Sequence, residues 1–281
     1  MLKGEIVIRK DALVIKTFIY IFLAAGAVTM VLPYVWMVVT SIKPLDEIQA
    51  FPPSFVVRHP TLEPYRDLFS LVPMVRYIFN SLFVAGSITL FNVFATSLAG
   101  YAFAKHKFWG RDKIFFIFIA SLMIPWQVNI IPGFIIVKNL GWLNTYTGLI
   151  VPAMAWCAFG IFLNRQFIYS IPDDLIDAAR MDGCSEFRIY CLVILPLIKP
   201  VLATLAIFTF LQQWNNFVWP LVVIHTSSMR TLTLGLAVLT GQFGANYAMV
   251  MAGAVVATLP MLIVYLMFQK YIIKGINLTG L

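Results

Sequence analysis

Charged residues are scarce in this sequence: only 11% of its 281 residues are Asp, Glu, Lys or Arg, against roughly 25% in a typical soluble domain. Hydrophobic residues make up 61% of the chain. They gather in runs of about 20 residues, each long enough to cross the hydrocarbon core of a bilayer. The composition therefore excludes an ordinary soluble domain and predicts an all-α, polytopic membrane protein.

Residues that carry catalytic or metal chemistry are also few. The cysteines have neither metal-ligand nor disulfide spacing, so we interpret them as small apolar residues: Cys157, Cys184 and Cys191. The histidines fall in three different predicted loops, which predicts neither a zinc site nor a catalytic cluster: His59, His106 and His225. No G-x-x-x-x-G-K-[ST] phosphate-binding loop occurs. We expect no catalytic residue, metal or cofactor in this chain, and no enzyme activity of its own.

The apolar runs predict six transmembrane helices, at residues 17–39, 74–99, 114–131, 146–164, 192–212 and 248–269. Residues 40–73 are predicted as a polar, proline-rich loop without helical periodicity, 132–144 as a short connection, and 213–247 as an aromatic and polar loop. The predicted organisation is a short segment 1–16, a six-span domain 17–270 with a polar insert at 170–191, and a tail 271–281.

The distribution of positive charge predicts the orientation of these spans. Six spans place both termini on one side, and that side carries fourteen of the twenty lysine and arginine residues. The opposite side carries Lys43, Arg58, Arg66, Arg76, Lys138 and Arg230. Because cytoplasmic loops are enriched in Lys and Arg, both termini and the insert are predicted to be cytoplasmic. This topology also explains the net charge of +8 without nucleic-acid binding, since no basic cluster is interleaved with aromatic residues.

No Asp or Glu lies inside any predicted span. Ion-coupled carriers usually depend on intramembrane carboxylates, so this absence argues against such a carrier. Amides and tryptophans, which suit sugar hydroxyls and C–H faces, are candidates for the substrate path: Asn80, Asn92, Gln127, Asn129, Gln213, Trp214, Asn215 and Asn216. The alternative is that the amides join helices and the tryptophans anchor the chain at the bilayer surface.

The polar insert holds five of the twelve acidic residues: Asp173, Asp174, Asp177, Asp182 and Glu186. Ser170 is predicted as an N-cap, followed by Pro172 and acids at the positive end of a helix. The helix is predicted over Asp173–Met181, with Gly183 as its stop and a second helix from Glu186 to Leu195. Such a cytoplasmic helix favours docking to a soluble partner, and the alternative is a solvated loop.

The insert also resembles a known motif. The residues D-A-A-R-M-D-G at 177–183, followed by I-L-P at 194–196, resemble the EAA loop of ABC-importer permeases. Other segments resemble the second permease subunit of the maltose-type carbohydrate-uptake branch, over roughly residues 75–275. They are M-I-P-W-Q-V-N-I-I-P, L-N-T-Y-T-G-L-I-V-P, F-L-N-R-Q-F, W-N-N-F-V-W-P-L and M-R-T-L.

Three features depart from the family pattern. Asp177 stands in place of the first Glu of the motif, which keeps the charge on a shorter side chain. Gln127 and Asn216 stand where relatives often carry acids. The tail ends in I-N-L-T-G-L rather than in a glycine- and alanine-rich segment, so contacts of the tail are not carried over.

The resemblance implies the type I ABC-importer permease fold and a place in a prokaryotic inner or cytoplasmic membrane. It implies a subunit of an ATP-driven, binding-protein-dependent importer of sugars or oligosaccharides. The implied partners are a second homologous permease, two cytoplasmic ATP-binding subunits that hold ATP and Mg, and an extracytoplasmic solute-binding protein. The alternatives are the same fold importing glycerol phosphate, a polyol or an acidic saccharide, and an ATP-independent channel or carrier.

The resemblance also implies which residues couple the chain to the ATPase: Leu175, Asp177, Ala178, Ala179, Arg180, Asp182 and Gly183. In this interpretation Leu175, Ile176 and the two alanines offer an apolar surface that the ATPase approaches closely. Asp177 and Arg180 supply polar contacts to it.

Overall fold

The computed structural model describes residues 2–244 and 246–278, and the side chains of 15–244, 246–267 and 269. The described residues form helices and no strand, which confirms the predicted all-α fold. They divide into two compact units, each described by itself. Unit 1 holds the chain up to Val72 together with Leu239–Val256, and unit 2 holds Pro73–Val238 and the chain from Ala257.

Within the described chain, the candidate membrane spans agree with six crossings. Three helices are long and apolar enough to cross a membrane unbroken: Ile15–Ser41, Met74–Lys105 and Tyr247–Met267. Three more candidates are pairs of helices, and the two members of each pair are bent against each other by 91°, 43° and 79°. Six spans result if each bent pair counts as one.

Unit 1 contains α1 (Leu2–Ser41), α2 (Leu45–Gln49) and α3 (Glu63–Leu71). The prediction of no helix in 40–73 is therefore wrong. The helix α3 has Glu63 and a proline in its first turn, and it buries Pro64 and Leu68. These residues favour a helix start and give it an apolar side, although the helix is too short for periodicity to be recognised in the sequence.

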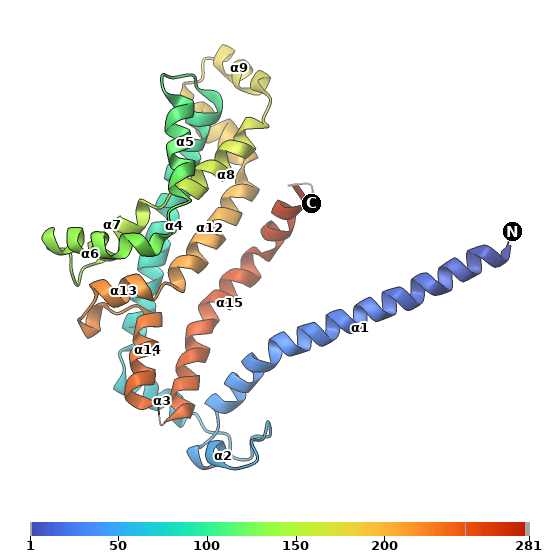
Figure 1. Cartoon of the computed structure of the whole chain (residues 1–281), viewed down its shortest axis with the longest axis vertical. Coiled ribbons are helices and arrows are strands. Elements are labelled where there is room, and N and C mark those ends of the chain that lie inside the picture. The colour runs from blue at the N-terminus through green and yellow to red at the C-terminus, as the bar shows by residue number, and fades with distance from the viewer. Residues whose placement is uncertain (1, 245, 279–281) are drawn as a thin grey trace. The chain divides into compact units, whose positions relative to one another are not determined.

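Unit 2 is built along α4 (Met74–Lys105), with α8 (Ala158–Tyr169) and α12 (Lys199–Trp214) packed beside it (Figure 1). Two glycines bring the backbones of α4 and α8 together. A Cβ atom on Gly100 would lie 2.6 Å from Asn164 Cβ, and one on Gly160 would lie 2.8 Å from Thr96. Asn164 also donates to Thr96 Oγ1 at 3.1 Å. Small residues and a buried amide thus join these helices, as is common in membranes.

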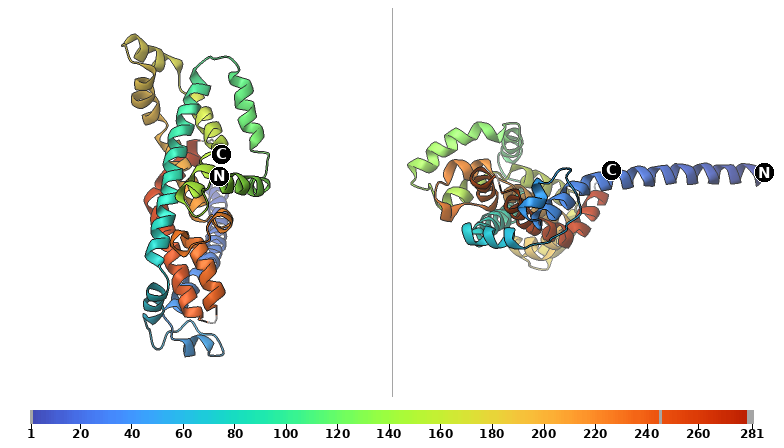
Figure 2. Two further views of the ribbon diagram at one scale, coloured as in Figure 1. Left: turned by 90° about the vertical axis from the view of Figure 1, so that its left-hand side faces the viewer. Right: turned by 90° about the horizontal axis from the view of Figure 1, so that it is seen from below.

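Prolines lie at or beside the breaks in the other spans. The first broken pair is α5 (Arg111–Ser121) followed by η1 (Trp126–Asn129) and α6 (Ile130–Asn139), with Pro125 at the bend (Figure 2). The second is α7 (Tyr146–Met154), which contains Pro152, followed by α8. A proline has no N–H group and cannot continue the helical hydrogen-bond pattern. The prediction of a connection over 132–144 is wrong, because most of these residues belong to α6.

The third broken pair begins with α10 (Glu186–Ile189), a π-helical segment labelled η2 (Tyr190–Ile194) and α11 (Leu195–Leu197). It continues after a 79° bend in α12, which has Pro200 in its first turn. The helix predicted from Glu186 is confirmed, whereas its π-helical segment is not predicted by any sequence pattern.

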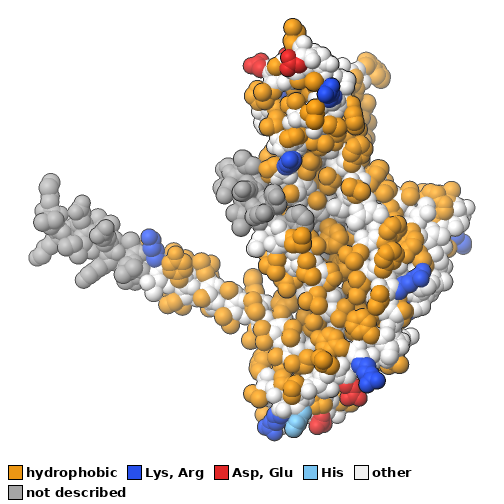
Figure 3. Space-filling view, turned by 180° about the vertical axis from the view of Figure 1, so that it is seen from behind, with side chains coloured by type: hydrophobic (Ala, Val, Ile, Leu, Met, Phe, Trp, Pro, Cys, Tyr) orange, Lys and Arg blue, Asp and Glu red, His pale blue; other side chains and the backbone are white. Residues whose placement is uncertain are grey.

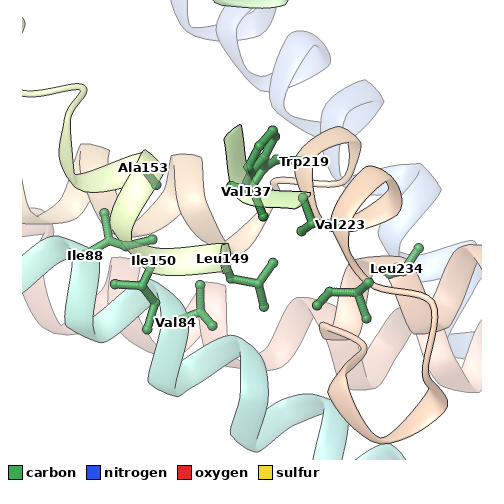
Figure 4. Packing of buried hydrophobic residues seen from close by; sticks show 10 residues of the cluster. Val84, Ile88, Val137, Leu149, Ile150, Ala153, Trp219, Val223 and Leu234 are labelled. Carbon is green, nitrogen blue, oxygen red and sulfur yellow. The ribbon is translucent and has the colours of Figure 1, made fainter. Parts of the chain in front are cut away.

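A core of buried apolar residues joins α4 to α6, α7, α13 (Val218–Val223) and the start of α14 (Leu232–Phe243) (Figure 4). Trp219 lies in this cluster and donates through its indole Nε1 to the carbonyl of Gly148 at 3.0 Å. The prediction of a loop over 213–247 is wrong, because α13, η3 (Ser227–Met229) and α14 lie within it. Their apolar sides gain stability by burial in this core.

Apolar side chains also dominate the surface shown in Figure 3, where charged side chains are sparse. On α5, for example, Phe116 and Ile117 are 70% and 67% exposed. In water such a surface would aggregate, whereas in a bilayer it meets lipid or another membrane subunit.

The close approach of α4 and α8 predicts an asymmetry between two glycines of the same helix. Gly100→Ala is expected to destabilise the protein by about 1–3 kcal/mol, since the new methyl group collides with Cβ and backbone atoms of α8. Gly86→Ala is the matched control, because a Cβ at Gly86 meets nothing within 4 Å. Thermal unfolding of both variants in detergent measures the difference, and equal melting temperatures would contradict this packing.

Candidate functional site

The polar insert forms the predicted helix, α9 (Asp173–Met181), at the same end of unit 2 as the C-terminal end of α4 (Figure 1). Asp173 and Asp174 lie in its first turn, where carboxylates interact favourably with the helix dipole. The N-cap is Pro172, and no side chain caps the helix. The prediction of Ser170 as N-cap is wrong, because its hydroxyl donates to the carbonyl of Phe167 at the end of α8.

Gly183 ends α9 in the way the sequence predicts. Its φ angle of +79° lies in the left-handed region. The N–H of Cys184 donates to the carbonyl of Ala179, and the N–H of Gly183 donates to that of Arg180, both at 3.0 Å. These two bonds form the glycine-dependent Schellman motif, which satisfies carbonyls that the helix itself leaves free.

The inner side of α9 packs against a second apolar cluster. Ile176 is 2% exposed and lies with Tyr101, Ile189 and Tyr190, and Ala179 packs against the same cluster. The interpretation of Ile176 as a surface for a partner is therefore wrong. Ile176 and Ala179 are three residues apart and so share one face of α9, and this face packs on the chain's own core.

Polar contacts fix the same side of the insert to α4. Lys105 is 6% exposed in its side chain, and its Nζ lies 2.6 Å from Asp173 Oδ1 while also donating to the carbonyl of Ile171. The hydrogen bond from this ammonium lowers the pKa of the Asp173 carboxyl, so Asp173 is ionised at neutral pH. At the other end of α9, Arg180 Nε donates to Glu186 Oε1 at 2.8 Å.

The outer side of α9 remains exposed. Among the predicted coupling residues, Leu175, Asp177, Ala178 and Asp182 are exposed, as is Gly183. Ala179 is half-buried, and Arg180 is exposed but bonded to two carboxylates. Two further apolar side chains of the insert are exposed, Met181 of α9 at 87% and Phe187 of α10 at 61%. The sequence analysis missed both, although apolar residues within a polar insert were a usable signal.

The predicted substrate-path residues separate into two groups. Those with interior contacts include Asn80, which is fully buried, donates to the carbonyls of Ser228 and Arg230 and accepts from Tyr146. Asn92 is buried and donates to the carbonyl of Ile88 on the same helix. The contacts of Asn80 match the alternative of amides that join helices, whereas the bond of Asn92 stays within α4.

Trp214 belongs to the same interior group, since it is buried and its Nε1 donates to the carbonyl of Ala257 at 3.2 Å. The second group is more open: Gln127, Asn129 and Asn215 are exposed, and Gln213 and Asn216 are half-buried. Asn215 donates to the carbonyl of Leu211 at the end of α12. Asn216 donates to Gln213 Oε1 at 3.5 Å. The role of all eight residues in transport stays a prediction.

No group of three or more His, Cys, Asp or Glu side chains suited to a metal occurs among the residues that the structure describes. The sequence analysis also missed the two residues that anchor the insert, Lys105 and Tyr101. Both lie on α4, far from the insert in sequence, so no local pattern identifies them.

Comparisons with known proteins agree with this architecture. Residues 92–277 match the family model "Binding-protein-dependent transport system inner membrane component". The chain is 34% identical, over 97% of its own length and 98% of the relative's, to the arabinooligosaccharides transport system permease protein AraQ of Halalkalibacterium halodurans.

Two other relatives are named for different substrates. The sn-glycerol-3-phosphate transport system permease protein UgpE of Yersinia enterocolitica is 32% identical over 92% of this chain and 95% of its own. The lactose transport system permease protein LacG of Rhizobium radiobacter is 29% identical over 91% of this chain and 93% of its own.

Among solved structures, the fold is similar to a chain of a bacterial ABC transporter involved in the import of the acidic polysaccharide alginate. The TM-score is 0.81 at 24% identity, covering 90% of this chain and 94% of that chain. The family resemblance inferred from the motifs is confirmed. The family model covers most of the sequence, and the chain belongs to the binding-protein-dependent transport system inner membrane components.

Proposed function

We propose that the chain is a permease subunit of an ATP-driven importer of sugars or oligosaccharides. The observation that carries the proposal is the geometry of α9. This helix is fixed to unit 2 through Ile176 and Asp173 and leaves its other side exposed at the end of the unit. The relatives named for arabinooligosaccharides and lactose support the substrate class.

The proposed assembly has four kinds of partner. A second homologous permease completes the translocation path, and an extracytoplasmic binding protein delivers the solute. Two cytoplasmic ATPase subunits hold ATP and Mg and carry out hydrolysis, so this chain itself is not an enzyme. The assembly lies in a prokaryotic inner or cytoplasmic membrane, with both termini of this chain in the cytoplasm.

In the proposed mechanism, a cleft of one ATPase subunit receives the exposed side of α9. Leu175 and Ala178 allow close apolar contact, while Asp177 and Asp182 offer carboxylates to donors of the partner. When the two ATPase subunits close on ATP, α9 moves as one piece, because its inner side is packed and ion-paired. The movement reaches the spans through α4 and α10.

A second candidate substrate is glycerol phosphate, favoured by the relative UgpE. An anionic substrate needs basic groups along its path. Of the basic residues near the spans, Arg76 uses its Nε to bind the carbonyl of Ser228, and Lys138 lies at the exposed end of α6. The more open path candidates are neutral amides, so the structure favours a neutral saccharide.

A comparison of two substitutions at Gly183 tests the coupling role. Gly183→Val is expected to lose most transport, because a β-branched residue at φ +79° strains the turn that ends α9. Gly183→Asn is the control, since Asn tolerates the left-handed conformation. Transport in proteoliposomes, at matched amounts of protein, measures both. Full activity of Gly183→Val would contradict coupling through this helix.

The proposed topology is checked with reporter fusions. A green fluorescent protein fused after Leu281 is expected to fluoresce, and alkaline phosphatase at the same position to stay inactive, because phosphatase folds only outside the cytoplasm. Phosphatase inserted at Arg58, in the loop proposed to face outward, is expected to be active. The reverse pattern would contradict a cytoplasmic α9.

The substrate class is tested with the purified assembly and its binding protein in proteoliposomes. A neutral oligosaccharide, such as an arabinooligosaccharide or lactose, is expected to stimulate ATP hydrolysis and enter the vesicles. Glycerol 3-phosphate is expected to do neither, since the open path residues carry no positive charge. Stimulation by glycerol 3-phosphate alone would replace the saccharide proposal with the anionic one.

A further inference from the structure

The carboxylate of Glu186 contacts three side chains, one on α9 and two at the C-terminal end of α4. Arg180 Nε donates to Oε1 at 2.8 Å, and Tyr101 donates its hydroxyl proton to Oε2 at 2.8 Å. His106 Nε2 lies 3.4 Å from Oε2. The carboxylate thus joins the C-terminal turn of α9 to the end of α4. We refer to these four residues as the Glu186 clamp.

The turn at Gly183 makes this clamp possible. Arg180 precedes the glycine on α9, and Glu186 follows it as the first residue of α10. The left-handed conformation reverses the chain between them, which brings the two charges together. The hydrogen bond to Glu186 raises the pKa of Arg180, so the guanidinium stays charged.

The clamp combines exposed side chains on the insert with a buried ring on α4. The side chains of Arg180 and Glu186 are 41% and 47% exposed, while Tyr101 is 3% exposed and lies in the apolar cluster under α9. Tyr101 and His106 also meet edge to face, with ring centroids 5.0 Å apart. The clamp therefore connects an accessible charge on the insert to a buried ring on a membrane-spanning helix.

Arg180 has little freedom to act as an independent partner contact. Its Nε is bonded to Glu186, and its Nη1 donates to Asp177 Oδ1 at 3.0 Å. Both bonds lie within the insert and hold the guanidinium along the side of α9. By contrast, Asp174 on the same helix makes no hydrogen bond or ion pair with the described residues.

We propose that Arg180 and Glu186 are positioning residues for transport: they act through each other and Tyr101 to fasten α9 to α4, rather than by contacting the ATPase. This inference rests on the proposed coupling function of α9. Loosening the clamp leaves the ATPase able to dock on the exposed side of the helix. It lets α9 move without α4, so hydrolysis continues while less solute crosses per ATP.

A double-mutant cycle tests this relation. The assembly is purified from its native membrane with wild-type chain, Arg180→Gln, Glu186→Gln and the double variant. Three quantities are measured: the ATPase subunit recovered per permease, the hydrolysis rate, and solute imported per ATP. Lys113→Gln is the matched control, since it removes a charge from an exposed side chain of α5 and lies outside both α9 and the clamp.

Each single variant is expected to recover normal amounts of ATPase subunit and to import about fivefold less solute per ATP. About fivefold is the change in an equilibrium constant at the upper end of what one partly exposed ion pair contributes. The double variant is expected to lose no more than the singles, because both remove the same interaction. Lys113→Gln is expected to match wild type. Tyr101→Phe, which keeps the ring and removes the hydroxyl, is expected to give a smaller loss of the same kind.

Three results would overturn the proposal. Losses that multiply in the double variant would show that Arg180 and Glu186 act independently. Loss of the ATPase subunit in Arg180→Gln alone would make Arg180 a partner contact, and normal import per ATP in both singles would remove any positioning role. If the Gln variants reach the membrane poorly, the cycle is repeated with Arg180→Lys and Glu186→Asp, which keep each charge but change the geometry of the bond. Failure of the wild-type chain to recover an ATPase subunit would instead refute the proposed function itself.

Discussion

The close packing of α4 against α8 is the contact on which the rest of unit 2 depends. Gly100 and Gly160 bring the backbones together, and Asn164 bonds to Thr96 across the same surface. Because lipid gives helices no hydrophobic reason to associate, such close contact and buried hydrogen bonding must hold them. The same α4 continues to Tyr101 and Lys105, so the helix that organises the spans also carries the anchors of α9.

This arrangement divides α9 into a side that belongs to the chain and a side that is free. Ile176 and Ala179 face the apolar cluster, and Asp173 and Arg180 are held by charges at the two ends of the helix. A helix held at both ends and packed between them transmits force without tilting on its own. The free side carries small and acidic residues, which we propose to dock on an ATPase. In that proposal, coupling and anchoring use different faces of the nine-residue helix.

The sequence predicts what depends on neighbouring residues and misses what depends on distant ones. The bounds of α9 and the turn at Gly183 follow from local helix preferences and from glycine's conformational freedom. The bond from Tyr101 to Glu186 spans 85 residues, and that from Asn80 to Ser228 spans 148, so no local pattern signals either. The apolar runs indicate where the candidate spans lie, but their bends lie at or beside prolines, and the short helices in 213–247 depend on packing around Trp219.

The claim that the free side of α9 meets an ATPase is tested most directly by cross-linking. Met181→Cys and, as a buried control, Ile176→Cys are made in a chain whose native cysteines are replaced, and each is treated in native membranes with a short bifunctional thiol reagent. The account predicts a cross-link from position 181 to a nucleotide-binding subunit, one that changes in yield with ATP, and none from position 176. A Met181→Cys variant that transports normally yet cross-links to no ATPase, with or without nucleotide, would contradict it.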